Sequence, residues 1–372
     1  MASLTISDLL IWSLWIFGAL ALITATAFGV FWLYLWVKYV PKVARMFQQP
    51  PIFRPQVSNP DPAGEPVRFQ TPDGFELTGS YLPATTDNRV GVVVFCHEFL
   101  GGRHSAYDYV GHLRNLGFDL FTFDFRNHGE SQAEAGLVQL QWLSDRELTD
   151  LRSALSYLRS RPDADPAGAG LFGVSRGGAA ALFVAGEDPR IWGVATDGAF
   201  PTRTTMLAYV HKWAPILVQQ WSMKIMPNFI FRWVAWSARV RTEKQLNRIF
   251  PRLESMIPKI PPRPWLAIHG ARDSYIGPDI ARDLVKRAGT GAPIDLWLVP
   301  KAKHNRCREA DPQAYQQRVA QFFCLNAPRR AELANNPIGT TDNSRIGELV
   351  VVVDHPSDPG QLLTAGQDSH QS

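Results

Sequence analysis

A serine between two glycines near the middle of the chain has the spacing of an enzymatic nucleophile. Residues 171–178 read LFGVSRGG and contain G-x-S-x-G as Gly173, Ser175 and Gly177. The motif lies between a short apolar run and a helical pattern that begins near Arg176. A serine at such a strand-to-helix turn projects from a tight bend, and the glycines relieve the backbone crowding. This context predicts a nucleophilic Ser175; the alternative is a serine that only shapes a turn.

Short apolar runs alternate with helical stretches on both sides of the motif. The runs cover residues 90–96, 118–123, 168–172, 191–196, 265–268 and 294–299, after a hairpin signal at 67–82, and the helical stretches lie near 105–116, 143–160, 176–187, 278–288 and 312–325. Continuous apolar strands separated by helices predict an α/β fold whose mostly parallel sheet is covered on both faces.

With these elements in place, the chain resembles an α/β-hydrolase with a serine nucleophile. It is similar to the bacterial membrane-anchored members of the serine aminopeptidase and esterase-like branch. The resemblance covers about residues 66–326 and is carried by G-x-S-x-G, HEFLG at 97–101, DFRNHGES at 124–131, IHGARD at 268–273 and a late His304. The segment at 124–131 is similar to the D-x-R-G-x-G-x-S loop of the family.

In this family the acid and the histidine follow the serine in chain order. The resemblance implies that His304 accepts the proton of Ser175 and that Asp273 orients the imidazole. A surface histidine is the alternative for His304, which has lysine neighbours, and Asp197 is the alternative acid. The His-Gly-x-x-Asp setting favours Asp273.

The oxyanion hole should consist of the backbone N–H of Arg176 and, by resemblance, that of Phe99. The family usually has His-Gly at the start of the second loop, whereas this chain has His97 followed by Glu98. A carboxylate that pointed inward would oppose a developing oxyanion. We therefore expect the Glu98 side chain to point outward into solvent.

Residues 199–262 carry no strand signal and are strongly basic, with ten Lys or Arg against two Glu. We interpret them as a helical cap insertion over the site. The candidates for substrate binding in it are Trp213, Trp221, Met223 and Met226. One interpretation is an ordinary amphipathic lid with a solvated basic face. The other is a surface that docks onto an anionic leaflet, with flexible Met side chains around an apolar pocket.

The 29 residues from Leu9 to Val37 carry no charge and are mostly apolar. A bilayer core needs roughly 20 such residues, and aromatic residues gather at both ends of the run. This pattern predicts an uncleaved single-pass membrane anchor; the alternatives are a buried helix and a cleaved signal peptide. Lys38, Lys42 and Arg45 follow the run, so the positive-inside rule places the catalytic domain in the cytoplasm.

These patterns divide the chain into five parts. They are an anchor at residues 1–45, a Pro-rich linker at 46–65, a hydrolase core at 66–198 and 263–326, the cap at 199–262, and a largely disordered tail at 327–372.

Composition excludes several other classes of protein. Hydrophobic residues make up 45% of the chain, which excludes a disordered protein. The three cysteines (Cys96, Cys307 and Cys324) are too few for a disulfide scaffold and are compatible with a reducing compartment. The chain has no H-E-x-x-H spacing, so we predict no metal, and no G-x-G-x-x-G follows the first strand, which argues against a dinucleotide cofactor. A net charge of +4 gives no indication of nucleic-acid binding.

Three functions follow as hypotheses. We favour a membrane-anchored serine hydrolase that cleaves acyl or lipid-like esters through an acyl-enzyme, with a small-molecule or lipid-like ester as its partner. The second is an aminopeptidase or amidase on the same triad, for which Glu98 could hold an amino terminus. The third is a catalytically silent hydrolase fold that serves as a membrane scaffold. The sequence gives no oligomeric state.

Overall fold

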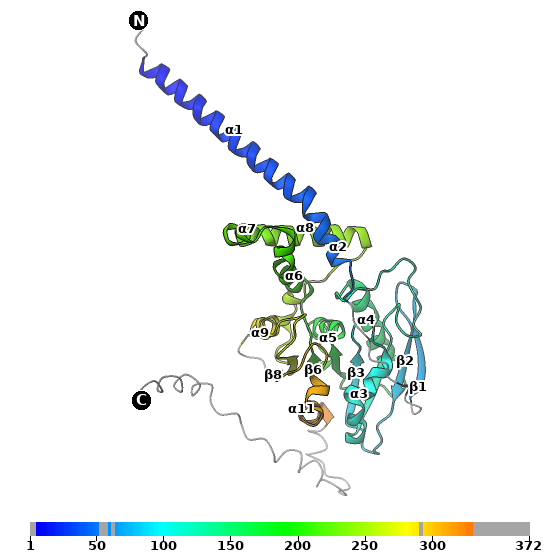
Figure 1. The fold of residues 1–372 in the computed structure, drawn as a ribbon. Coiled ribbons are helices and arrows are strands. Elements are labelled where there is room, and N and C mark those ends of the chain that lie inside the picture. The colour runs from blue at the N-terminus through cyan, green and yellow to red at the C-terminus, as the bar shows by residue number, and fades with distance from the viewer. Residues whose placement is uncertain (1–4, 52–58, 61–63, 290–292, 330–372) are drawn as a thin grey trace, which may run out of the picture.

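The protein folds around a single eight-stranded sheet with the strand order β1-β2-β4-β3-β5-β6-β7-β8 (Figure 1). This computed structural model describes residues 5–51, 59–60, 64–289 and 293–329. The strands are β1 (Glu65–Gln70), β2 (Glu76–Leu82), β3 (Gly91–Cys96), β4 (Phe118–Phe123), β5 (Ala169–Val174), β6 (Ile191–Asp197), β7 (Trp265–Gly270) and β8 (Ile294–Val299). The β1–β2 hairpin and the β2–β4 pair are antiparallel, and all other pairs are parallel. The predicted mostly parallel sheet is confirmed.

Helices cover both faces of the sheet, as continuous apolar strands require. Successive residues of β3 alternate between two cores: Val92 and Val94 pack on one face, and Val93 and Phe95 on the other. The first core is closed by α4 (Asp145–Ser160), α5 (Arg176–Ala185) and α9 (Pro278–Arg287), and the second by α3 (Ala106–Val110) and α11 (Pro312–Asn326). The helix expected at 105–116 is a short α3 between two 3-10 turns, Arg103–Ser105 and Gly111–Leu116.

The segment between β6 and β7 is helical throughout its regular part. It contains α6 (Thr202–Leu217), α7 (Gln220–Ile225) and α8 (Asn228–Leu246), followed by 3-10 turns at Leu253–Ser255 and Ile257–Lys259. These helices lie between the N-terminal helix and the sheet (Figure 1). Helix α2 (Val40–Phe47) packs against α8, and Phe47 is buried in the same cluster as Phe231.

Helix α1 (Ile6–Lys38) projects away from the rest of the protein (Figure 1). Its 33 residues span roughly 50 Å at 1.5 Å per residue, more than the ~30 Å of a bilayer core. Residues 10–47, with a mean hydropathy of 2.1 in the most apolar window, form a candidate membrane span, although length and composition alone would also suit a signal sequence. Its last turns contact the cap, where the Trp32 and Trp233 ring centroids lie 4.4 Å apart.

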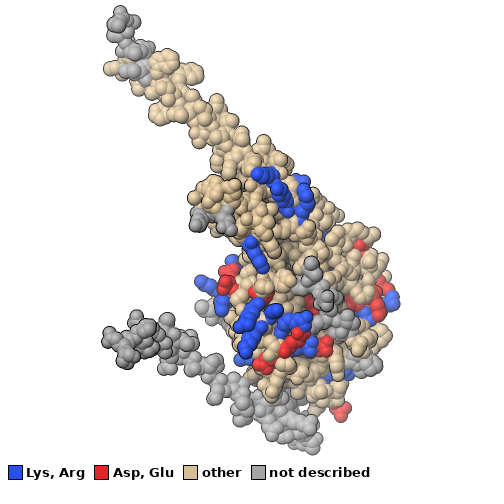
Figure 2. All heavy atoms as spheres, in the orientation of Figure 1, with Lys and Arg blue, Asp and Glu red and all other residues tan. Residues whose placement is uncertain are grey.

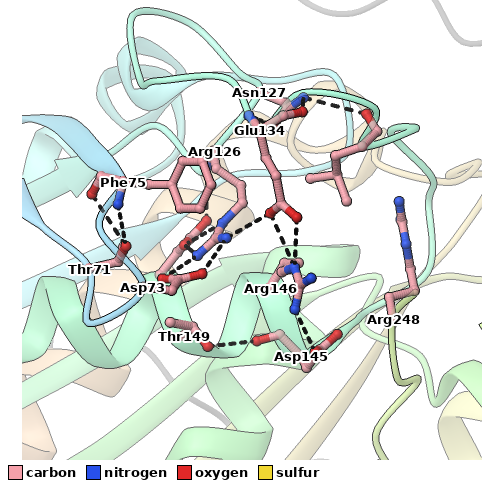
Figure 3. A network of polar contacts seen from close by, with 12 residues as sticks. Thr71, Asp73, Phe75, Arg126, Asn127, Glu134, Asp145, Arg146, Thr149 and Arg248 are labelled. Carbon is pink, nitrogen blue, oxygen red and sulfur yellow. Dashed lines mark hydrogen bonds and ion pairs between the residues drawn. The ribbon is translucent and has the colours of Figure 1, made fainter. Parts of the chain in front are cut away.

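The loop after β4 is held by a buried arginine. Arg126, whose side chain is 1% exposed, donates from Nε and Nη2 to Asp150 at 2.9 and 2.7 Å. Its Nη1 donates to Asp73 at 2.7 Å and to Glu134 at 2.8 Å (Figure 3). Three segments far apart in sequence therefore meet at one guanidinium. The same loop continues to His128, next to the candidate site.

We expect Arg126→Leu to lower the free energy of unfolding by about 3–5 kcal/mol at pH 7.5, because it leaves the buried Asp150 carboxylate without its cationic partner and with only the backbone N–H of residue 126 as a donor. Burial raises the pKa of Asp150 to about 6, so the loss should shrink at pH 5, where that carboxyl is protonated. Urea unfolding at both pH values measures this. The control is Arg68→Ala, which removes an exposed pair with Glu76 and should cost less than about 1 kcal/mol. A similar loss of unfolding free energy in both variants would contradict the role of Arg126 in holding the loop after β4.

Candidate functional site

Ser175 stands on a sharp turn between β5 and α5. Its backbone has φ 53° and ψ −115°, a conformation that costs free energy in a residue with a side chain. The flanking glycines are sterically required. A Cβ on Gly177 would lie 2.2 Å from the carbonyl oxygen of Cys96, and one on Gly173 would lie 2.5 Å from that of Gly177. The Ser175 N–H donates to the Asp197 carbonyl oxygen at 2.7 Å, which fixes the turn to the next strand.

The three residues expected to form a triad lie in hydrogen-bond contact. Ser175 Oγ is 3.0 Å from His304 Nε2, and His304 Nδ1 is 2.6 Å from Asp273 Oδ2. The other carboxylate oxygen of Asp273 accepts from the N–H groups of Tyr275 and Ile276 at 2.9 and 2.8 Å. Burial acts to raise the pKa of Asp273, but the hydrogen bond and charge of His304 hold it below its usual value. This arrangement can transfer a proton away from Ser175.

The alternative acid, Asp197, has other partners. It is fully buried, and its Oδ2 accepts from the Tyr315 hydroxyl at 3.0 Å. Burial raises the pKa of Asp197 to about 6. A carboxylate that stabilises an imidazolium must be ionised, which a lower pKa favours. Its position therefore supports a structural role, and the geometry favours Asp273 as the partner of His304.

Two backbone N–H groups close to the serine are those of Arg176, the next residue, and Phe99, which lines the same cleft. Arg176 is the first residue of α5, where helical N–H groups have no intrahelical partner. Within the described part of the chain, neither its N–H nor that of Phe99 donates a hydrogen bond. The Arg176 side chain lies in the core, where it donates to the Leu140 carbonyl oxygen at 2.8 Å and contacts His128 Nε2 at 3.1 Å. The two N–H groups are thus available to an oxyanion.

A cleft of about 700 Å³, including its open mouth, lies over Ser175. Side chains from several elements line it, among them Phe99, Gln141, Trp142, Phe200, Tyr209 and Tyr275. Sequence reasoning missed Gln141, Trp142, Tyr209 and Tyr275. The first two precede α4 in a loop with no periodic pattern, and no motif distinguishes the tyrosines.

The four cap residues singled out from the sequence do not line this cleft. Trp213 and Met226 line a separate apolar groove between α2, α6 and α8. Trp221 is 62% exposed, and Met223 packs against the buried cluster that contains Phe47 and Phe231. From the cap, Phe200 and Tyr209 contact the cleft instead.

The expectation that Glu98 points into solvent is wrong. Its side chain is 6% exposed and lines the cleft beside Ser175. The carboxyl group folds over Gly101, where an added Cβ would lie 2.8 Å from Glu98 Cδ. Burial raises the pKa of Glu98 to about 7, so the group is largely neutral below neutral pH and opposes an oxyanion less than a full charge would.

Among the described residues, no group of three or more His, Cys, Asp or Glu is placed to hold a metal ion. The polar groups of the cleft are those of acid–base and nucleophilic chemistry.

A family model described as "Alpha/beta hydrolase family" matches residues 93–319. The chain belongs to this family. The predicted fold and family resemblance are therefore confirmed, and the protein is a hydrolase by family. The uncharacterized protein YfhR of Escherichia coli (strain K12) is 27% identical over 297 residues, covering 77% of this chain and 89% of that protein.

Other relatives are more distant. The thiohydrolase aneE of Aspergillus aculeatus is 29% identical over 126 residues, covering 34% of this chain and 38% of that protein. The esterase Pf2001 of Pyrococcus furiosus has a TM-score of 0.55 at 21% identity, with 75% of this chain and 97% of that one covered. The alpha/beta hydrolase GrgF of Penicillium sp. sh18 has a TM-score of 0.52 at 17% identity, with 71% and 99% covered. These structural likenesses show a shared fold.

The buried Glu98 makes stability depend on pH. The folded chain holds its proton up to about pH 7, whereas the unfolded chain releases it near 4.5. Stability therefore falls as pH rises from about 4.5 to 7, by up to about 3 kcal/mol, and then levels off. Glu98→Gln lacks this penalty, so its stability gain over wild type should grow between pH 5 and pH 8.

Chemical unfolding in detergent at pH 5, 6.5 and 8 measures that gain. The control is Glu65→Gln, which alters a carboxylate that is 54% exposed and should show a small, constant difference. A Glu98→Gln difference that did not change with pH would contradict the raised pKa.

Proposed function

We propose that the protein is a membrane-anchored serine hydrolase that cleaves carboxylic esters through an acyl-enzyme. The observation that carries the proposal is the continuous hydrogen-bonded chain from Ser175 through His304 to Asp273 at the floor of a cleft. The backbone strain at Ser175 adds support, because such strain persists where the surroundings enforce it and is common at active sites.

The geometry supports the following sequence of steps. Ser175 Oγ attacks the ester carbonyl carbon while His304 Nε2 takes its proton, and Asp273 stabilises the imidazolium. The carbonyl oxygen becomes an oxyanion that accepts hydrogen bonds from the N–H groups of Phe99 and Arg176. The tetrahedral intermediate collapses, and the alcohol leaves with the proton from His304. Water then attacks the acyl-enzyme by the same route and releases the acid.

An aminopeptidase or amidase is the second candidate, and one observation favours it. Glu98 lies in the cleft, where its carboxylate could hold an amino terminus. Charge opposes this reading, because residues 199–262 carry ten basic and two acidic residues and Arg306 lines the cleft. A guanidinium in the cleft and a basic segment beside it disfavour a cationic substrate, so we favour esters.

Membrane attachment is supported by α1 and by the cap surface beside it. Lys38, Lys42 and Arg45 are exposed near the C-terminal end of α1. Figure 2 shows basic side chains where α1 meets the rest of the protein and almost none along the helix itself. Large apolar side chains on the nearby cap helices are also exposed, namely Ile216, Trp221, Ile225, Phe229 and Trp236. Basic residues beside aromatic ones suit an anionic leaflet. The positive-inside rule would then place the catalytic domain in the cytoplasm.

Labelling with a fluorophosphonate probe tests the triad. We expect wild type to label, Ser175→Ala and His304→Ala not to label, and Asp273→Asn to label at a rate lower by on the order of 10³-fold or more. Asp197→Asn serves as the control, since Asp197 bonds Tyr315, and should label nearly as fast as wild type. Labelling of Ser175→Ala, or loss of labelling in Asp197→Asn alone, would overturn the assignment.

Vesicle flotation tests the cap surface. The chain should begin at Tyr39, because α2 is packed into the cap and α1 must be absent. We expect flotation with phosphatidylglycerol-containing vesicles, weaker flotation with pure phosphatidylcholine, and a drop with Trp221→Ala/Trp236→Ala. Tyr107→Ala, at an exposed aromatic residue on α3, is the matched control. Equal binding to neutral and anionic vesicles would count against docking through basic residues.

A further inference from the structure

Three buried side-chain oxygen atoms in the cleft lack hydrogen-bond partners. Within the described part of the chain, they are Glu98 Oε2, Gln141 Oε1 and Asn305 Oδ1. The Glu98 and Gln141 side chains are 6% and 7% exposed, and both residues line the cleft that contains Ser175. A buried polar atom without a partner costs free energy, so a folded protein rarely keeps one without a reason.

Among the other described carboxyl groups, some have a cationic or histidine partner, and three (Asp165, Asp197 and Glu254) also keep one buried oxygen without a partner. Asp124 pairs with Arg103, Asp150 with Arg126, and Asp273 with His304. Glu98 differs because its free oxygen belongs to a residue of the cleft, where a ligand can supply the missing donor. The Gln141 amide oxygen and the ionised Glu98 carboxylate are both acceptors, so the group that complements the two together is a hydrogen-bond donor.

The charge around the cleft indicates which donor fits. Arg306 lines the same cleft, and the cap segment at 199–262 carries ten basic against two acidic residues. The Arg306 guanidinium in the cleft and the basic cap segment disfavour an ammonium group, which leaves a neutral hydroxyl as the suitable donor. A hydroxyl also matches an ester that approaches from a membrane surface, because partial esters of polyols combine an acyl chain with free hydroxyl groups.

We propose that Glu98 and Gln141 form a subsite that accepts a hydrogen bond from a substrate hydroxyl, so that the enzyme selects esters with a hydroxyl near the scissile bond. This inference rests on the proposed esterase function. The hydroxyl can belong to the leaving alcohol, as in a monoacylglycerol, or to the acyl part, as in a 3-hydroxyacyl ester. A site built to bond a hydroxyl discriminates strongly against an analogue that lacks it.

Two substrate pairs distinguish these sources in the full-length protein. The first is 1-octanoylglycerol against its 2,3-di-O-methyl ether, and the second is ethyl 3-hydroxyoctanoate against ethyl octanoate. We expect wild type to prefer the hydroxylated member of one pair by about tenfold or more in kcat/KM. Glu98→Leu and Gln141→Leu should each reduce that preference about tenfold, because the loss of kcat/KM falls mainly on the hydroxylated member.

Thermal unfolding separates this role from a structural one. Glu98→Leu removes an unpartnered buried group, so its Tm should rise while its selectivity falls. Asp165→Asn is the matched control, because Asp165 Oδ2 also lacks a partner in the described structure but the residue precedes β5 at the opposite strand end. This variant should keep the substrate preference of wild type.

The outcomes are distinct from those that test the esterase itself. Hydrolysis of p-nitrophenyl butyrate that is lost in Ser175→Ala establishes the esterase. If that holds and wild type prefers neither hydroxylated substrate, the subsite alone is overturned. The subsite is also overturned if Glu98→Leu and Gln141→Leu lower kcat/KM equally for both members of a pair. Faster turnover of an aminoacyl ester than of either hydroxylated ester overturns it as well. Absence of any Ser175-dependent turnover overturns both proposals.

Discussion

The close approach of helix α5 to the end of β3 is the constraint on which the site depends. Gly177 lies so near the carbonyl oxygens of Cys96 and His97 that a Cβ would stand 2.2 and 2.5 Å from them. Only a glycine allows this contact, and the contact forces the preceding Ser175 into its strained turn. The same approach brings the start of α5 next to the loop after β3. The serine and the two backbone donors are therefore positioned by one steric requirement.

Much of the fold and part of the site follow from local pattern. Parallel strands of a covered sheet are largely apolar, so β4 and the edge strand β8 have the bounds expected from the sequence, and their carboxyl ends must share one edge. Ser175, Asp273 and His304 each follow such a strand, which is why their meeting could be anticipated. The direction of a side chain in a loop does not follow from such a pattern. Glu98 is buried because Gly101 leaves room for its carboxyl group, a fact of packing that no spacing reveals.

The cap was harder to anticipate for a related reason. Its helices are rich in aromatic residues on more than one side, so periodicity does not say which side meets the cleft. Helix α2, which is far away in sequence, determines it. This helix covers one side of α8 and leaves Trp213 in the groove between α2, α6 and α8. Tyr209, on the same helix as Trp213, is thereby the residue that reaches the cleft. Long-range packing decides what a local pattern leaves open.

Helix α2 also connects the candidate membrane span to the wall of the cleft. Helix α2 follows α1 after one residue, and its last residue, Phe47, accepts a hydrogen bond from Trp142 Nε1 at 2.8 Å. Trp142 is 1% exposed and lines the cleft above Ser175. Because both residues are buried, α2 is fixed relative to the cleft wall, and the end of α1 packs on the cap beside it through Trp32 and Trp233. If α1 spans a bilayer, the cleft therefore meets the membrane surface in one defined orientation, which a flexible tether would not provide.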